Sequence, residues 1–342
     1  MSCCVGALNV SELRRDPVTG RWVIIAPDRS RRPEDFTPQP VGAMDGDMCP
    51  FCEGQESIAG RELLAWRPGG SVSNGPGWRV RVVANREPAL RVEGTLGEDR
   101  GLLFQSWGGL GAHEVVIESA DHRATLATMS ADDVWRILWA WRERLRDLRR
   151  DIRLKSFFIV KNVGAPAGAT LDHPHSQILA LPFPPHALAV EIEGATSFHA
   201  KTSRCVFCDL ISGETADRRR VISSDEGALA IAPYASRVPF EVWVLPQVHC
   251  AAFEEAGDEM LRAVAERLRD VMRRLDATLV APPYSMMLHT CPTESADHAA
   301  YHWHLEIVPR LRPESGVAWE GGVMINPVPP EEAAQVLRAN SL

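Results

Sequence analysis

The chain of 342 residues is long enough to form two domains of ordinary size, each with a substantial core. Its formal net charge of −8 argues against general binding to nucleic acid, so any phosphate group must be bound by a local cluster of residues. The sequence shows neither an apolar run of about eighteen residues that would cross a membrane nor a secretory signal. We therefore expect a cytoplasmic enzyme without membrane or nucleic-acid partners.

The first half of the chain contains several strand patterns and one long helix pattern. Runs of β-branched and apolar residues between turn residues predict the strands. Between Ser130 and Leu154 apolar residues recur at helical spacing, and Ser130 begins a capping sequence. Stretches rich in proline or glycine predict surface loops, the second of which is a candidate cover for a nucleotide. The strands are predicted at Trp22 to Ala26, Val80 to Ala84, Glu114 to Glu118, Phe157 to Lys161 and Gln177 to Leu181, and the loops at Arg31 to Pro40 and Gly69 to Gly77.

The second half repeats this order after a proline-rich junction between Pro182 and Lys201. A helix is predicted from about Asp258 to Leu279. Strands, a helix and further strands in each half predict an α+β fold, whose two sheets are expected to join across a pseudo-twofold axis. The strands are predicted at Ala228 to Ala232, Glu241 to Leu245, Ser285 to His289 and His302 to Pro309.

A Cys-x-x-Cys sequence occurs once in each half, and two distant histidines follow each copy. The copies are Cys49-Pro50-Phe51-Cys52 and Cys205-Val206-Phe207-Cys208. Their near-equal histidine intervals indicate an internal duplication. The intervals are 51 residues from His122 to His173 and 53 residues from His249 to His302.

The flanking sequences support the duplication. The segment from His173 to Ile178 aligns with the segment from His302 to Ile307, and the first keeps Ser-Gln where the second has Leu-Glu. An alignment of the Glu-Val runs that precede the histidines places His113 opposite Phe240, which gives His113 no role as a ligand. The sequence thus predicts two related halves, with phosphate chemistry retained in the first and lost in the second.

Two thiolates and two imidazoles form a closed tetrahedral Zn²⁺ site, which is a structural site. A disulfide or a pair of free thiols is the alternative, and the lack of a secretory signal argues against the disulfide. A redox pair of the thioredoxin type is disfavoured, because neither copy sits between a strand and a helix of a βαβ unit. We therefore expect two Zn²⁺ ions per chain, bound by Cys49, Cys52, His122 and His173 and by Cys205, Cys208, His249 and His302.

The sequence Asp172-His173-Pro174-His175-Ser176-Gln177 predicts a phosphate-transfer site. Proline favours an extended backbone, so both imidazoles are expected on one face. If His173 binds zinc, His175 is free to attack phosphorus, because a neutral imidazole is a good nucleophile. The alternative for His175 is a buried histidine of the core. Residues that can bind phosphate through side-chain or backbone donors are Gln177, Ser176, Thr170, Gly164 and Gly168.

Several segments together resemble a known family. They are Leu13 to Pro27, Arg29 to Pro33, Asn85 to Leu90, Lys161 to Thr170 and the His-Pro-His-x-Gln sequence at His173. This combination is similar to the galactose-1-phosphate uridylyltransferases, the double-domain branch of the histidine-triad superfamily. The resemblance implies two histidine-triad-like domains, each an antiparallel sheet with packed helices. The first, at residues 1–190, would be catalytic and carry the first zinc site, and the second, at residues 200–342, would be degenerate and carry the second.

The resemblance also implies a ping-pong reaction. His175 would attack the α-phosphorus of UDP-glucose, glucose 1-phosphate would leave, and a hexose 1-phosphate such as galactose 1-phosphate would take the uridylyl group. Gln177 would stabilise the uridylyl-histidine, and the partner subunit of a homodimer would contribute tail residues between Glu320 and Asn326. The remaining implied substrate contacts are Arg29, Arg32, Asn85, Asn162, Gly168, Thr170 and Ser176, although the two arginines alternatively form a solvated basic patch.

The sequence departs from the family pattern near its carboxyl end. Better-known bacterial members carry a Gly-Tyr-Glu-Met type of segment, whereas this chain has Gly321 to Glu332 without it. This tail resembles the branch that also contains plant-type ADP-glucose phosphorylases, so adenylyl transfer by the same histidine is the alternative, as is nucleotide hydrolysis. A non-catalytic, zinc-stabilised nucleotide-binding protein is a further alternative, which the presence of both His175 and Gln177 disfavours.

Overall fold

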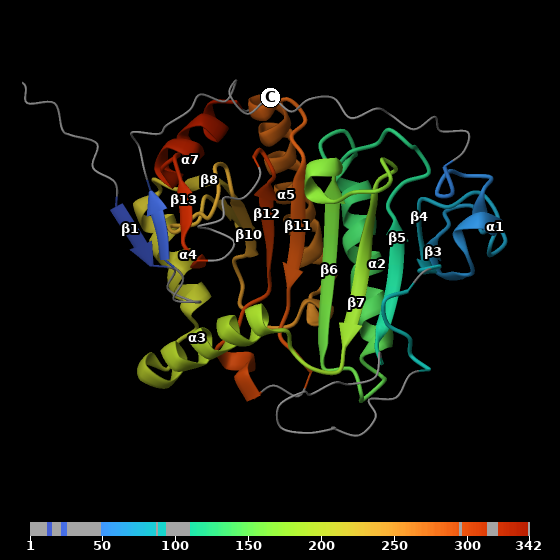
Figure 1. Ribbon diagram of the computed structural model, residues 1–342, viewed down its shortest axis with the longest axis horizontal. Coiled ribbons are helices and arrows are strands. Elements are labelled where there is room, and N and C mark those ends of the chain that lie inside the picture. Colours follow the sequence, from blue (N-terminus) through green and yellow to red (C-terminus); the bar gives the residue numbers. More distant parts are fainter. Residues whose placement is uncertain are drawn as a thin grey trace, which may run out of the picture.

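The computed structural model describes residues 12–15, 22–25, 49–86, 88–93, 110–293, 296–312 and 321–340. Its main feature is a ten-stranded sheet in which all neighbouring strands are antiparallel (Figure 1). In spatial order the strands are β3 (Glu62–Trp66), β4 (Val80–Ala84), β5 (Ala112–Ile117), β7 (His175–Leu181), β6 (Ser156–Val163), β11 (Tyr284–His289), β12 (His304–Pro309), β10 (Val242–Pro246), β9 (Ala228–Ile231) and β8 (Val221–Ser224).

The two halves of the chain meet at the centre of this sheet. β6 of the first half pairs with β11 of the second, and each half adds its other strands outward from this pair in equivalent order. The predicted α+β fold and the joining of two sheets across a pseudo-twofold axis are therefore confirmed. Continuous antiparallel pairing across the junction leaves no open edge at the middle of the molecule.

Strand register corrects one alignment made from the sequence. Gln177 lies opposite Val115 on β5, and its equivalent Glu306 lies opposite Trp243 on β10. Val115 is therefore equivalent to Trp243, and His113, two residues earlier, is equivalent to Glu241. The alignment of His113 with Phe240 is wrong by one residue. The error matters because a slip of one residue moves a side chain to the opposite face of a sheet.

Two long helices cover one face of the sheet. α2 (Ala131–Leu148) and α5 (Asp258–Leu279) lie side by side on it and bury their apolar stripes, with Trp141 and Leu268 each about 1% exposed (Figure 1). Ser130 caps α2 by accepting a hydrogen bond from the Asp133 backbone N–H at 3.1 Å. The predicted helix ran to Leu154, but α2 ends at Leu148, where a series of turns leads into β6.

Shorter elements complete the fold. A three-stranded sheet joins the two ends of the described chain, since β2 pairs antiparallel with β1 and parallel with β13. None of the described helices is long and apolar enough to cross a membrane. The remaining elements are β1 (Glu12–Arg15), β2 (Trp22–Ile25), α1 (Glu56–Ala59), η4 (Ala165–Ala167), α3 (His186–Thr202), α4 (Val206–Asp217), η5 (Phe253–Glu255), η6 (Ala296–Ala299), β13 (Met324–Asn326) and α7 (Pro330–Ala339).

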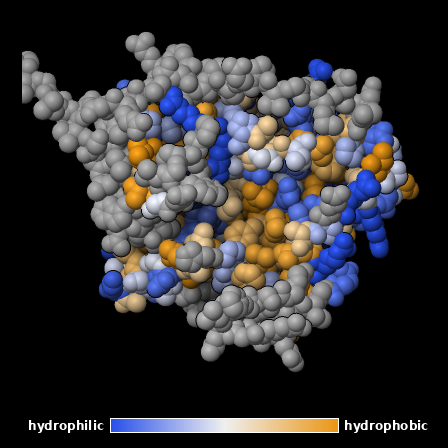
Figure 2. All heavy atoms as spheres, viewed as in Figure 1, coloured by the Kyte–Doolittle hydropathy of each residue, from blue (hydrophilic) through white to orange (hydrophobic). Residues whose placement is uncertain are grey.

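The other face of the main sheet is not covered by α2 and α5. Figure 2 shows apolar side chains gathered over the middle of this face, with hydrophilic side chains beside them. Alternate residues of β7 point to this face, and the residues between them point into the core beneath the helices. His175 and Gln177 thus lie on the face of the sheet that the two long helices do not cover.

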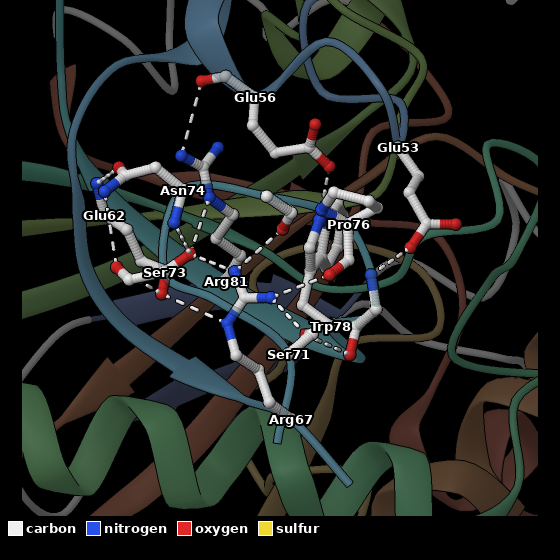
Figure 3. A network of polar contacts seen from close by, with 12 residues as sticks. Glu53, Glu56, Glu62, Arg67, Ser71, Ser73, Asn74, Pro76, Trp78 and Arg81 are labelled. Atoms are coloured by element: carbon white, nitrogen blue, oxygen red, sulfur yellow. Dashed lines mark hydrogen bonds and ion pairs between the residues drawn. The ribbon is translucent and has the colours of Figure 1, made fainter. Parts of the chain in front are cut away.

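The loop between β3 and β4 is held by a network of polar contacts (Figure 3). The Arg67 guanidinium donates to Ser71 Oγ at 2.7 Å and to the carbonyl oxygens of Gly75 and Pro76 at 2.9 Å. Glu62 accepts hydrogen bonds from both Arg67 and Arg81. The stretch from Gly69 to Gly77 is a surface loop, as predicted, but none of its residues lines the cavity that contains His175, so the structure gives no support for its role as a nucleotide cover.

Replacing Asp276 by asparagine is expected to stabilise the fold at pH 8. Burial near the carboxyl end of α5 raises the pKa of Asp276 from 3.8 to about 6, so its ionised form is disfavoured in the folded state. The free-energy cost of ionising the buried Asp276 carboxyl is absent below the unfolded pKa of 3.8. It grows as the pH rises and is complete above the folded pKa of about 6. A gain of about 1 to 2 kcal/mol in the free energy of unfolding is expected at pH 8. Urea unfolding of both proteins at pH 8 and pH 4 measures this gain. An equal change in the free energy of unfolding at the two pH values would contradict the prediction.

Candidate active site and metal centres

His175 begins β7 and points to the face of the sheet opposite the long helices. Gln177, two residues later, points the same way. Ser176 points to the helix side, where its Oγ accepts a hydrogen bond from Trp141 Nε1 at 2.8 Å and is fully buried. The prediction that the Ser176 hydroxyl contacts substrate is therefore wrong, because strand geometry separates it from its two neighbours.

Hydrogen bonding fixes the tautomer of His175. Its Nδ1 lies 2.8 Å from the His173 carbonyl oxygen, which only accepts, so Nδ1 carries the proton and Nε2 keeps its lone pair. Burial lowers the pKa of His175, and the nearby Lys161 ammonium lowers it further. The imidazole is therefore neutral near pH 7 and presents a nucleophilic nitrogen.

A buried ion pair supports the strand that carries this histidine. Lys161 on β6 donates to Glu118 Oε2 at 2.6 Å and to the His175 carbonyl oxygen at 3.3 Å, and both charged side chains are at most 2% exposed. In the sequence Lys161 begins one of the segments that resemble the family. Its ammonium contacts the backbone of β7, so its direct effect is on the position of His175.

A cavity of about 410 Å³ opens in front of His175 and Gln177. Asn85 and Thr170, two predicted substrate contacts, line it. Phe51, which lies between the first two cysteines, also lines it and packs against the His175 ring at a centroid distance of 5.3 Å. The cavity therefore brings together residues that are more than a hundred positions apart in the sequence.

Two other predicted contacts lie nearby. Asn162 is two residues beyond Val160, which pairs with Gln177, so Asn162 projects from the same face of the sheet as Gln177. Gly168 ends η4 with a φ of 85°, a left-handed conformation that glycine adopts without strain. Neither lines the cavity in the described structure.

The described structure does not bring Asn326, a predicted substrate contact, to the candidate site. Asn326 lies on β13, is fully buried, and uses its amide within the fold. Its Nδ2 donates to the carbonyl oxygens of Ser236 and Val238 at 3.1 Å, and its Oδ1 accepts from the Val328 N–H at 3.0 Å. With its amide bonded in this way, it has no group to offer a sugar. Arg29 and Arg32 lie outside the described residues.

The first predicted metal set comes together beside the nucleophile. The ligand atoms of Cys49, Cys52, His122 and His173 all lie within 4.8 Å of one another. Nδ1 of His122 and Nδ1 of His173 are 3.3 Å apart, and Nε2–H of His173 donates to the Ser119 carbonyl oxygen at 2.8 Å. Burial lowers the pKa of His173 to about 4. Two nitrogen lone pairs facing each other beside thiols suit a Zn²⁺ ion, with the carbonyl orienting the ring.

The second set repeats this arrangement in the other half. His249 and His302 each donate Nε2–H to a carbonyl oxygen, at 2.9 and 3.0 Å, and turn Nδ1 toward Cys208 Sγ at 3.3 and 3.7 Å. A hydrogen bond from Cys208 lowers the pKa of Cys205 to about 4. This shift favours the thiolate of Cys205, the form that binds metal. Its ligand atoms, from Cys205, Cys208, His249 and His302, also lie within 4.8 Å of one another.

Family models match both halves of the chain. A model of the N-terminal domain of galactose-1-phosphate uridyl transferase matches residues 6–185, and a model of its C-terminal domain matches residues 191–327. The chain belongs to the galactose-1-phosphate uridylyltransferase family. It is an enzyme of that family, and its fold is α+β.

The relatives of this chain include both an ADP-glucose phosphorylase and galactose-1-phosphate uridylyltransferases. It is 33% identical to an ADP-glucose phosphorylase of Arabidopsis thaliana, over 97% of this chain and 93% of the relative. It is 30% identical to a galactose-1-phosphate uridylyltransferase of Thermotoga maritima, over 96% and 98%. The crystal structure of the Arabidopsis ADP-glucose phosphorylase with bound ADP-glucose aligns with a TM-score of 0.81 and 32% identity, over 97% of this chain and 99% of that one.

The structure of this uridylyltransferase-family chain reveals a third group of metal-capable residues that sequence reasoning missed. Glu191 of α3, His289 of β11 and His304 of β12 bring their ligand atoms within 4.8 Å of one another. His289 Nδ1 lies 2.8 Å from Glu191 Oε2, and although burial alone would lower the pKa of His289, Glu191 and Glu306 raise it to about 10. The group can hold a cation or the proton of His289.

The same group explains how the two halves differ. His304, the equivalent of His175, also directs Nδ1 to a carbonyl oxygen, that of His302, at 3.1 Å. Its Nε2, however, lies 3.6 Å from Glu191 Oε1. A carboxylate at this position would repel an incoming phosphate. His113, to which the sequence pattern gave no role, was also missed by sequence reasoning. In the structure His113 contacts Gln177 directly.

Proposed function

We propose that this protein is a UDP-glucose:hexose-1-phosphate uridylyltransferase that acts through a covalent uridylyl-histidine at His175. The observation that carries the proposal is the neutral His175 imidazole beside Gln177 at a cavity of about 410 Å³. Its Nδ1 is bonded to a carbonyl, and its Nε2 makes no hydrogen bond to the residues that the structure describes. A volume of this size is in the range of small-molecule sites. Galactose 1-phosphate is the proposed acceptor.

In the first half-reaction, the lone pair of His175 Nε2 attacks the α-phosphorus of the nucleotide sugar. A phosphorus–nitrogen bond forms, the bond to the bridging oxygen breaks, and glucose 1-phosphate leaves with that electron pair. The positive charge that develops on the imidazole is stabilised because Nδ1–H points at the His173 carbonyl oxygen. In the second half-reaction a phosphate oxygen of the acceptor attacks the same phosphorus, and the electron pair of the phosphorus–nitrogen bond returns to Nε2.

Other predicted residues take supporting roles in the proposal. Gln177 and Thr170 donate to non-bridging phosphate oxygens, Asn85 contacts the nucleotide, and Arg29 and Arg32 neutralise phosphate charge. Asn162, which projects from the same face of the sheet as Gln177, and Gly168 are proposed as further phosphate contacts. Ser176 and Asn326 are not part of it, for the reasons given above.

A second candidate is an adenylyl transferase of the ADP-glucose phosphorylase type. It is supported by the 33% identity to the Arabidopsis ADP-glucose phosphorylase and by the structural match to that enzyme with bound ADP-glucose. The chemistry at His175 is the same for both candidates. They differ in the base that the cavity accepts and in the second acceptor, which is inorganic phosphate for a phosphorylase.

Zn²⁺ is proposed for both Cys/His sets, and its function there is structural, because four protein ligands leave no open position. We also propose a cytoplasmic homodimer, since metal-bound thiolates require a reducing compartment and the family resemblance implies a dimer. Size-exclusion chromatography with light scattering tests the dimer, and a monomer at micromolar concentration would contradict it.

Intact-protein mass spectrometry tests the covalent step. The protein is incubated separately with UDP-glucose, UDP-galactose and ADP-glucose, without acceptor, and quenched at mildly alkaline pH to preserve the phosphorus–nitrogen bond. A uridylyl adduct mapped to His175, released by galactose 1-phosphate, is the expected result. An adenylyl adduct released by inorganic phosphate would favour the second candidate, and the absence of any adduct would count against both.

A further inference from the structure

We propose that His113 is a positioning residue, which holds the Gln177 amide so that its NH₂ group faces the phosphate of the bound nucleotide. The proposal rests on the function proposed above. Nothing in the sequence pattern assigned a role to His113. His113 lies on β5, the strand next to β7, opposite Leu179 and diagonally across from Gln177, and it is not among the residues that line the cavity.

The hydrogen bonds of His113 determine its tautomer. The Ala89 backbone N–H donates to His113 Nδ1 at 3.1 Å, so Nδ1 has its lone pair and no proton. The proton of the neutral ring is therefore on Nε2. That nitrogen lies 2.7 Å from Gln177 Oε1 and donates to it. A backbone amide thus sets the direction of a side-chain hydrogen bond that ends at a residue of the candidate active site.

This bond decides which end of the Gln177 amide is offered to substrate. A primary amide has an acceptor oxygen and a donor nitrogen on one planar group. With Oε1 bonded to His113, the NH₂ group is the end that remains for the cavity, which Gln177 lines together with His175. Phosphate oxygens accept hydrogen bonds, so this orientation attracts the α-phosphate. The opposite orientation would place an oxygen against it.

Asn85 takes part in the same arrangement. Its Nδ2 lies 3.1 Å from His113 Nε2. Since Nε2 carries the proton, an asparagine turned so that Oδ1 approaches Nε2 would accept from it as well. In that orientation Asn85, which lines the cavity together with Gln177, would also leave its NH₂ group for a phosphate oxygen.

The second half of the chain provides an internal comparison. The residues equivalent to His113 and Gln177 are Glu241 and Glu306, and the Arg237 guanidinium bridges them, at 2.7 Å to Glu241 Oε1 and in direct contact with Glu306. Ionised carboxylates only accept hydrogen bonds. The half with the acidic pair therefore presents acceptors beside His304, whereas the half with the cavity presents a donor beside His175.

A double-mutant cycle tests the proposal through the rate at which His175 acquires the nucleotidyl group in a single turnover. His113→Phe keeps an aromatic ring and removes the proton, and Gln177→Ala removes the group on which it acts. We expect His113→Phe to slow adduct formation about 10- to 100-fold with little change in nucleotide-sugar affinity. In the Gln177→Ala background the same substitution should have no further effect. His113→Asn, whose amide can donate to Gln177 Oε1, should recover part of the rate.

The controls separate the two proposals. Metal content and the melting temperature establish that each variant folds, and His113→Leu, which also has no proton to donate, replaces His113→Phe if the latter does not fold. Adduct formation by His113→Phe at the unmodified rate, or independent effects of the two substitutions, would overturn the role of His113. A lack of adduct on His175 in the unmodified protein would instead count against the proposed function.

Discussion

Replacing His175 by alanine is expected to abolish nucleotidyl transfer and to leave the fold and the metal content unchanged. The side chain lies at the surface of the cavity and its Nε2 makes no structural hydrogen bond that the described contacts include, so its removal eliminates the attacking atom without opening the core. Loss of an enzyme's nucleophile reduces turnover by about 10⁴-fold or more. Exchange of label between nucleotide sugar and hexose 1-phosphate measures the rate, and mass spectrometry measures the adduct.

His304→Asn is the matched control for this experiment. His304 has the same position in the second half and the same hydrogen bond to the carbonyl two residues before it, but its Nε2 faces Glu191. We expect the variant to form the adduct on His175, with some loss of stability because the buried group around Glu191 is disturbed. An adduct in His175→Ala, or its absence in a folded His304→Asn, would contradict the assignment of the nucleophile.

Replacing Cys52 by serine is expected to lower both the metal content and the transfer rate. Cys52 faces Nδ1 of His122 at 3.3 Å and Nδ1 of His173 at 3.6 Å. The same segment supplies Phe51, which packs on the His175 ring, and His173 supplies the carbonyl that fixes the tautomer of His175. Loss of the ion would allow both the Phe51 ring and the His173 carbonyl to move from their positions beside His175. We expect about one metal ion fewer per chain and a 10- to 100-fold lower transfer rate.

Cys208→Ser is the comparison variant. It separates a local effect of the first metal on His175 from an effect of metal loss on the stability of the whole fold. It removes a ligand of equivalent geometry, with Sγ 3.3 Å from His249 Nδ1, but in the half that has no phosphate site. The metal content should again fall by about one ion, measured by mass spectrometry of the acid-released metal. Transfer at a temperature well below melting should stay within about threefold of the unmodified rate. Equal losses of activity in the two variants would show that both metals act only through global stability.

The sequence by itself determined the features that depend on local pattern. Helical periodicity predicted α5 with the bounds that the structure has, from Asp258 to Leu279. The repeated Cys-x-x-Cys sequences and the histidine intervals selected two sets of four residues, and the structure brings each set together. The proline between His173 and His175 predicted an extended segment, and β7 begins there. The helix and the extended segment were predictable because spacing along one chain segment places their residues. The metal sets were predictable because zinc takes cysteine and histidine ligands and because the pattern occurs twice.

Only the tertiary structure decided which predicted residues share a site. Ser176 and His175 alternate across β7, and the packing of the helices on one face of the sheet decided that Ser176 is buried and that His175 faces the cavity. The group of Glu191, His289 and His304 joins α3 to two strands, and the bond from His113 to Gln177 joins β5 to β7. Such contacts depend on strand register and on the packing of distant elements. Both are set by burial over the whole core, which no local pattern contains.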